Sequence, residues 1–216
     1  MISPAATVAE LVVARSGSAR VFERLGLDYC CGGKRSLADA CRERGLDVDA
    51  VAAELERAEP AAGSCEIAGL SNAELCEHVV SAHHDRLREE LPRLSTLLDK
   101  VVRAHGQDDP RLVFVRAAFS DLRAELEEHI GEEERVLFPA IAAGDTVVAA
   151  AFEDDHERAG ALLERLSELT DGYDLRGARC NTHRATLTAL AELQLDLHQH
   201  IHEENNVLFP RAATTA

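Results

Sequence analysis

A sequence repeat dominates the C-terminal two thirds of the chain. HIGEEERVLFP at residues 129–139 matches HIHEENNVLFP at residues 200–210, and HDR at 84–86 matches HER at 156–158. The histidines that open these stretches are 45 residues apart in the first copy and 44 in the second. This repeat indicates one helical hairpin used twice, each copy supplying a His and then a His-x-x-x-Glu pair. A pair spaced by four residues lies on one face of a helix.

Four helices are predicted by apolar residues that recur at steps of three and four. Ser71 and Glu74 form a capping box that opens the first helix. The breaks HGQDDP (105–110), Pro139 with AAGD (142–145), and TDGYDLRG (170–177) are short, which favours an all-α, up-down four-helix bundle. The predicted buried stripes are Val80, His84, Leu87, Leu91, Leu94, Leu98 and Val101; Leu112, Val115, Phe119, Leu122, Leu126, His129, Glu133 and Val136; Val148, Phe152, His156, Ala159, Leu163 and Leu166; and Leu187, Leu190, Leu193, Leu197, His200, Glu204 and Val207.

The rest of the chain predicts a second, smaller unit. Residues 1–58 read as short helices broken at glycines, with LGLDYCCGGKRSL at their centre. Residues 59–70 mix Pro, Gly and Ser without periodicity and are expected to be a linker. Residues 71–216 would then form the bundle.

The net charge and the hydropathy of the chain argue against nucleic acids and membranes as partners. A net charge of −16 argues against nucleic acid, whose phosphates are bound by Lys and Arg, and against an anionic membrane surface. No apolar run approaches the roughly 20 residues that span a bilayer. The N-terminus lacks a basic stretch ahead of an apolar one, so we expect a cytoplasmic protein with reduced cysteines.

The polar residues within the four stripes predict a metal centre. A lone histidine on an apolar face is usually a hydrogen-bonded core residue, but a buried Glu is rare unless it is paired. Here the polar residues fall at about one level of the bundle, and burying two carboxylates there without a cation would be severely unfavourable. Six ligands exceed one tetrahedral zinc site and suit two metals, each with two His and both bridged by Glu; iron, manganese and zinc all accept such ligands. The predicted ligands are His84, His129, Glu133, His156, His200 and Glu204.

At these residues the chain resembles hemerythrin-like proteins, and more closely the Ric family of di-iron proteins for repair of iron centres. The matching stretches are DYCCGGKRSL (28–37), HHDRLREELPRL (83–94), HIGEEERVLFP, DDHERAGALL (154–163) and HIHEENNVLFPRA (200–212). The resemblance implies two iron ions with an oxo or hydroxo bridge on the same six ligands. Oxygen-carrying hemerythrins have a fifth histidine where this chain has Gly160, which favours reactivity over reversible oxygen carriage.

The adjacent cysteines Cys30 and Cys31 have two interpretations. They are either small residues filling a tight turn beside Gly32 and Gly33, or a reactive thiol pair whose pKa is lowered by nearby positive charge. The sequence around the two cysteines is compatible with both interpretations, and the resemblance favours a thiol pair that exchanges electrons, iron or nitric oxide with the metal centre.

Glu125 and Asp155 are candidates to orient ligands or relay protons. The remaining histidines, His78, His83, His105, His183, His198 and His202, have no place in the repeat and are expected at the surface or behind the ligands.

The resemblance implies repair of iron–sulfur proteins damaged by nitrosative or oxidative stress, by iron donation or by reduction of nitric oxide. The alternatives are an oxygen, nitric oxide or iron binding protein without turnover, and a peroxidase-like di-iron enzyme acting on peroxide. The N-terminal unit would dock on its own bundle or, in a homodimer, on that of the partner.

Overall fold

A computed structural model describes residues 1–15, 17–59, 67–144 and 152–214. The predicted stripe residue Val148 and most of the predicted linker, residues 60–66, lie outside this part of the chain. The described residues contain no β-strand, and the predicted all-α class is confirmed. None of the described helices is long and apolar enough to cross a membrane.

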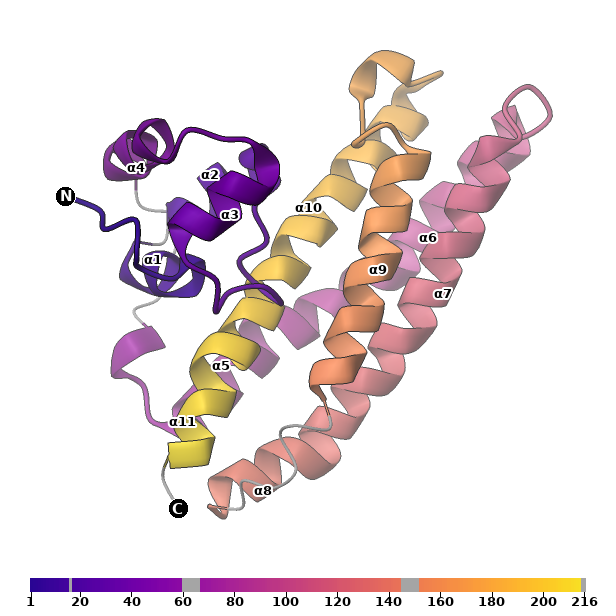
Figure 1. Ribbon diagram of the computed structural model, residues 1–216. Coiled ribbons are helices and arrows are strands. Elements are labelled where there is room, and N and C mark those ends of the chain that lie inside the picture. Colours follow the sequence, from indigo (N-terminus) through magenta and orange to yellow (C-terminus); the bar gives the residue numbers. More distant parts are fainter. Residues whose placement is uncertain (16, 60–66, 145–151, 215–216) are drawn as a thin grey trace.

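The predicted bundle is present, and three of its four long helices contain a π turn, whereas α9 is a single α-helix over its described residues (Figure 1). The helix α7 packs between α6 and α9, and α10 packs against α6. The core between them is mainly leucine and includes the buried Phe119. The bundle elements are α5 (Asn72–Val79), η2 (Val80–His84), α6 (Asp85–His105), α7 (Arg111–Glu132), η3 (Glu133–Leu137), α8 (Phe138–Ala142), α9 (Glu153–Leu169), α10 (Asn181–Glu203), η6 (Glu204–Leu208) and α11 (Phe209–Thr214).

The predicted ends of these helices agree with the structure at several points. Ser71 caps α5, and the reciprocal hydrogen bonds with Glu74 are both present. The segment between α6 and α7 coincides with HGQDDP, and the segment between α9 and α10 contains the short 3-10 helix η5 (Leu175–Gly177).

Three π-helical turns, η2, η3 and η6, were not predicted. Each is closed by a backbone hydrogen bond five residues back: from Asp85 to Val80, from Phe138 to Glu133 and from Phe209 to Glu204. A π turn holds one more residue than an α turn, and such turns are frequent at functional sites. All three begin or end at a predicted metal ligand.

Two expectations near these turns are corrected. The predicted stripe placed Val136 in the core, but Val136 is 47% exposed and Leu137 is buried, whereas Val207 at the same place in η6 is buried as predicted. Pro139 was expected to end its helix, yet α8 continues to Ala142. A proline is tolerated there because it sits in the first turn of α8, where no intrahelical partner for its missing N–H is needed.

The N-terminal residues form four short helices: α1 (Val8–Ala14), α2 (Ser18–Leu25), α3 (Leu37–Arg44) and α4 (Val48–Arg57). Gly26 and Gly45 end α2 and α3 in the left-handed conformation, at φ of 64° and 66°, which glycine adopts without steric cost. These helices surround their own apolar core, which includes Phe22, Leu37 and Leu55. They lie beside α10 of the same chain (Figure 1). The predicted domain boundaries at residues 58 and 71 stay a prediction.

Candidate metal centre

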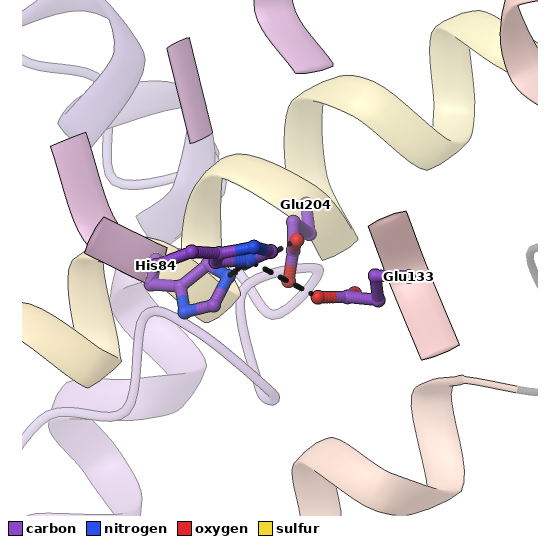
Figure 2. A group of neighbouring side chains, drawn as sticks. His84, Glu133 and Glu204 are labelled. Carbon is purple, nitrogen blue, oxygen red and sulfur yellow. Dashed lines mark hydrogen bonds and ion pairs between the residues drawn. The ribbon is translucent and has the colours of Figure 1, made fainter. Parts of the chain in front are cut away.

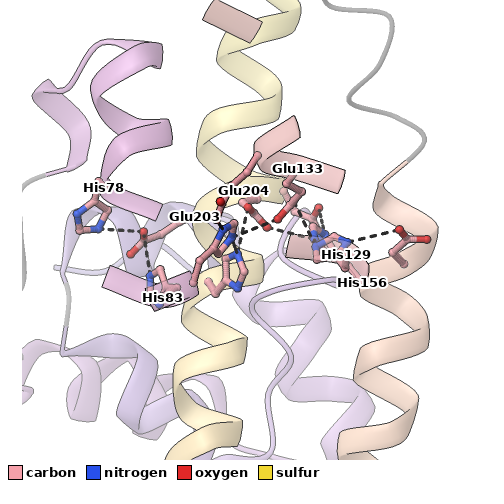
Figure 3. A network of polar contacts seen from close by, with 12 residues as sticks. His78, His83, His129, Glu133, His156, Glu203 and Glu204 are labelled. Carbon is pink, nitrogen blue, oxygen red and sulfur yellow. Dashed lines mark hydrogen bonds and ion pairs between the residues drawn. The ribbon is translucent and has the colours of Figure 1, made fainter. Parts of the chain in front are cut away.

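The six predicted ligands converge in the bundle core, close to the π turns (Figure 3). His84 is the last residue of η2, whereas Glu133 and Glu204 are the first residues of η3 and η6. One turn before each glutamate, a histidine of the same helix faces the same way. All six side chains are buried: His84, His129, Glu133, His156, His200 and Glu204.

One half of the cluster joins the first and last long helices. The Nε2 atoms of His84 and His200 lie 3.2 Å apart. Glu133 Oε2 lies 3.3 Å from His84 Nε2, and Glu204 Oε1 lies 3.1 Å from His200 Nε2. Figure 2 shows His84 facing the two carboxylates. These four side chains could hold one metal ion.

The other half uses the same two glutamates. The Nε2 atoms of His129 and His156 lie 3.1 Å apart. Glu133 Oε1 lies 3.2 Å from His129 Nε2, and Glu204 Oε2 lies 3.1 Å from His156 Nε2. Each carboxylate therefore presents one oxygen to each pair of histidines, as a carboxylate that bridges two metals does.

The histidine pairs form between the two hairpin repeats. His84 and His129 belong to the first repeat, yet His84 pairs with His200 and His129 pairs with His156. The sequence repeat correctly predicts two histidines on each side. It does not indicate which ones meet, because that depends on how the two hairpins pack.

The donor set fits a pair of cations. All four carboxylate oxygens of Glu133 and Glu204 are buried and accept no hydrogen bond within the described residues. Ligand atoms about 2.1 Å from a common ion would be about 3.0–3.4 Å apart, which matches the measured spacings. A metal would supply the positive charge that two buried carboxylates otherwise lack.

The histidines and glutamates perturb one another's pKa. Burial opposes the charged form of His129, but the carboxylate of Glu133, 3.2 Å from His129 Nε2, outweighs it and raises the His129 pKa to about 9. Burial also opposes the ionised form of Glu204, whose pKa is nevertheless held well below its ordinary value by His200 and His156. In His200 burial prevails, and its pKa is lowered.

Hydrogen-bond partners on the outer ring nitrogens orient three of the histidines. His84 Nδ1 donates to Glu134 Oε1 at 2.8 Å, and His129 Nδ1 donates to Asp155 Oδ2 at 3.4 Å. Carboxylates only accept, so the proton is on Nδ1 and the neutral ring leaves an Nε2 lone pair aimed inward. His156 Nδ1 likewise donates a hydrogen bond to the amide oxygen Oδ1 of Asn205, at 2.8 Å. The sequence analysis singled out Asp155 but missed Glu134 and Asn205.

The phenylalanines of the repeated LFP motif pack against the centre. Phe138 stacks on His84 with ring centroids 5.6 Å apart, and Phe209 stacks on His156 at 5.9 Å. Each follows a π turn directly, so the turn decides where its ring points. The motif is part of the site, a role that spacing alone did not reveal.

A narrow cavity of about 10 Å³ lies against the second histidine pair. It has room for about one water-sized molecule. Apart from its own stretch of helix, no described residue has an atom within 4 Å of the position that a Cβ would take at Gly160, the place of the fifth histidine in the resemblance. Arg158 connects the two acidic lining residues by donating to Glu125 and Asp155. The lining residues are Glu125, Leu126, His129, Asp155, His156, Ala159, Leu197, His200 and Ile201.

The cysteine loop lies against η6. Asn206 Nδ2 donates to the carbonyl of Cys30 at 2.8 Å, and His202 Nδ1 donates to the carbonyl of Tyr29 at 3.2 Å. A Cβ at Gly33 would lie 2.6 Å from Asn206 Oδ1, so only glycine permits this approach. His202 and Asn206 are thus contact residues that the sequence analysis did not assign.

The two thiols differ in environment. Cys30 is buried and Cys31 is exposed, with sulfurs 3.9 Å apart. The Cys30 thiol donates toward Cys31 and lowers the Cys31 pKa, with smaller contributions from the positive charges of His156 and His198. The pKa of Cys30 is raised by the same contact and by burial. Arg35, one of the cations near the pair in sequence, is instead bound to Asp28 and Glu43.

Comparison with known proteins agrees with this arrangement. The hemerythrin HHE cation binding domain matches residues 77–212, and ScdA_N, a domain of unknown function (DUF542), matches residues 4–59. The iron-sulfur cluster repair protein YtfE of Pectobacterium carotovorum is 37% identical over 95% of this chain and 96% of its own length. The protein of the same name from Yersinia pseudotuberculosis is 37% identical over 94% of each chain.

Proposed function

The chain belongs to the hemerythrin HHE cation-binding family and is a relative of the iron-sulfur cluster repair proteins. On this premise we propose that it repairs damaged iron–sulfur clusters with a dinuclear iron centre. The observation that carries the proposal is the position of Glu133 and Glu204. Each carboxylate has one oxygen on each histidine pair, and both are buried without a hydrogen-bond donor. The six residues named above would hold the two irons, which would supply redox chemistry and positions for small ligands.

Nitric oxide reduction suits the geometry of the site. Two bound ferrous ions would supply the two electrons that, with two protons, convert two nitric oxide molecules to nitrous oxide and water. A cavity with room for about one water-sized molecule lies beside His129 and His156, on the side from which a small ligand would approach. Asp155 and Glu125 line that cavity and are placed to deliver the protons.

Iron donation to a damaged cluster is the second route by which the same centre would act. The exposed Cys31 lies on a loop held to η6, the turn that begins with Glu204. We assign Cys31, supported by Cys30, the role of a thiol that exchanges electrons, iron or nitric oxide between the centre and its clients. Iron–sulfur proteins damaged by nitrosative or oxidative stress are the clients.

Two anaerobic assays on the reduced, iron-loaded protein test these routes. Nitrous oxide release after addition of nitric oxide is expected for the reductase, with iron retained. Transfer of iron to a protein with a nitric-oxide-damaged [4Fe–4S] cluster is expected for donation, with iron lost from the donor. Glu133→Gln should lose both activities, and Glu128→Gln, an exposed change on the same helix, should keep them. Reversible spectra of bound nitric oxide with neither product would favour a binding protein and contradict the repair proposal.

A further inference from the structure

A second cluster of potential ligands lies beside the centre, formed by His78, His83 and Glu203 (Figure 3). His78 comes from α5, His83 from η2, and Glu203 is the last residue of α10. The Nε2 atoms of the two histidines lie 3.2 and 3.3 Å from the same oxygen, Glu203 Oε2. All three ligand atoms lie within 4.8 Å of one another.

The surroundings hold these groups in the orientation that a metal site requires. His83 Nδ1 donates to Asp196 Oδ1 at 3.4 Å, and Arg86 donates to the same oxygen at 3.2 Å. A carboxylate behind a histidine in this way directs the Nε2 lone pair toward a metal. Gln199 donates to Glu203 Oε1 at 2.8 Å, which fixes the carboxylate and leaves Oε2 for the cluster.

The spacings are compatible with coordination. Ligand atoms of one ion lie about 3.0–3.4 Å apart, and the observed 3.2 and 3.3 Å fall in that range. Two imidazoles and one carboxylate, with further positions open, are a known donor set for Fe(II) and for zinc.

We propose that His78, His83 and Glu203 form a third, mononuclear metal site that takes a divalent first-row cation such as Fe²⁺. The site lies between solvent and the dinuclear centre. The side chain of His78 is 20% exposed, whereas Glu203 is buried and precedes the ligand Glu204. The ring of His83 stacks on that of His200, with centroids 5.1 Å apart and planes 6° from parallel. An ion bound here would lie next to the dinuclear centre, because His83 and Glu203 directly precede the ligands His84 and Glu204. This placement makes the site a point of entry or exit for iron, a role that rests on the proposed function.

Metal counting on the full chain tests the site itself. Iron-loaded protein is treated with excess Co²⁺, desalted, and analysed for both metals. We expect three metal ions per chain in the unaltered protein and two in His78→Asn and in Glu203→Gln, corresponding to at least a 100-fold loss of Co²⁺ affinity, since loss of an outer partner alone costs 10–100-fold. Glu77→Gln, which removes an exposed carboxylate next to His78, should still give three.

The variant Glu133→Gln/Glu204→Gln separates this proposal from the dinuclear one. It should bind no iron at the main centre but still take one Co²⁺, which the further change His78→Asn removes. Two irons and no Co²⁺ in the unaltered protein, or no Co²⁺ in the double variant, would overturn the third site and leave the dinuclear proposal intact. Fewer than two irons in the unaltered protein, with the Co²⁺ site present, would contradict the dinuclear proposal alone.

Discussion

At the scale of single residues, the centre is organised around Glu133 and Glu204. Moving an ionised carboxylate into the core costs several kcal/mol after relaxation, and a domain's whole stability is about 5–15 kcal/mol. Neither side chain has a hydrogen-bond donor to offset this cost within the described residues. Protonated histidines offset part of it in the metal-free chain, and bound cations would offset more.

The metal-free protein should lose stability as the pH rises from about 6.5 to 9. The folded-state pKa of His129 is raised to about 9, above the unfolded value of about 6.5, so its contribution is fully present below pH 6.5 and lost as the pH passes 9. We expect the free energy of unfolding in urea to fall by about 1–3 kcal/mol over this interval. Metal-loaded protein should show no such fall, because bound imidazoles carry no Nε2 proton.

Glu133→Gln is the matched variant for this measurement. It removes the charge that raises the His129 pKa, so the metal-free variant should have a flatter dependence on pH. Stability that increases between pH 6.5 and 9 in the unaltered, metal-free chain would contradict the assignment.

The residues of the site differ in how far their sequence predicts them. The repeat and the cost of buried charge identify all six predicted ligands, and the structure brings these six together. This reasoning does not predict the roles of Glu134 and Asn205, or the cluster of His78, His83 and Glu203. Their partners lie on other helices, and helix-surface polar residues are too common for spacing to single them out.

At the scale of helices, the π turns decide which side chains face the centre. The step pattern of an ideal helix predicted the long segments and their ends well. It failed at Val136, which is exposed, although Val207 at the same place in η6 is buried as predicted. The two turns differ in what covers them, because Val207 lies beside Thr7 and Ala9 of the N-terminal unit, and apolar periodicity alone does not show this.

Inserting one alanine after Arg135 in η3 should damage the centre, whereas Arg135→Ala should not. Arg135 is exposed, so its side chain contributes little to packing. The insertion would rotate Leu137 and Phe138 by about 100°, away from the core and from His84. We expect a loss of about 3–5 kcal/mol in unfolding free energy, the range for truncating a large buried side chain, together with loss of bound iron. Insertion protein with unchanged stability and iron content would show that the register after the turn is dispensable.

At the scale of the whole molecule, η6 connects the centre to the N-terminal helices. Three consecutive residues have separate contacts: Glu204 faces both histidine pairs, Asn205 orients His156, and Asn206 holds the cysteine loop. The sequence predicted a Cys-Cys unit and a bundle but left open where they meet. The contact depends on a glycine and an asparagine that lie more than 170 residues apart.

The neighbouring variants Asn205→Ala and Asn206→Ala should therefore have different effects. Asn205→Ala removes the partner of His156 Nδ1 and should weaken iron binding by about 10–100-fold. Asn206→Ala should leave iron binding unchanged and speed amide hydrogen exchange in residues 28–35, because a lost hydrogen bond is worth about 1 kcal/mol. Equal effects of the two changes on iron and on exchange would contradict the division of roles along η6.

The most direct test of the dinuclear centre is the iron content of protein purified from iron-replete cells. We expect two irons per chain in the unaltered protein. Because each glutamate contacts both histidine pairs, Glu133→Ala and Glu204→Ala should each fall below one iron per chain, while the exposed control Glu128→Ala keeps two, with helical content checked by circular dichroism. Full iron content in both glutamate variants would contradict the account.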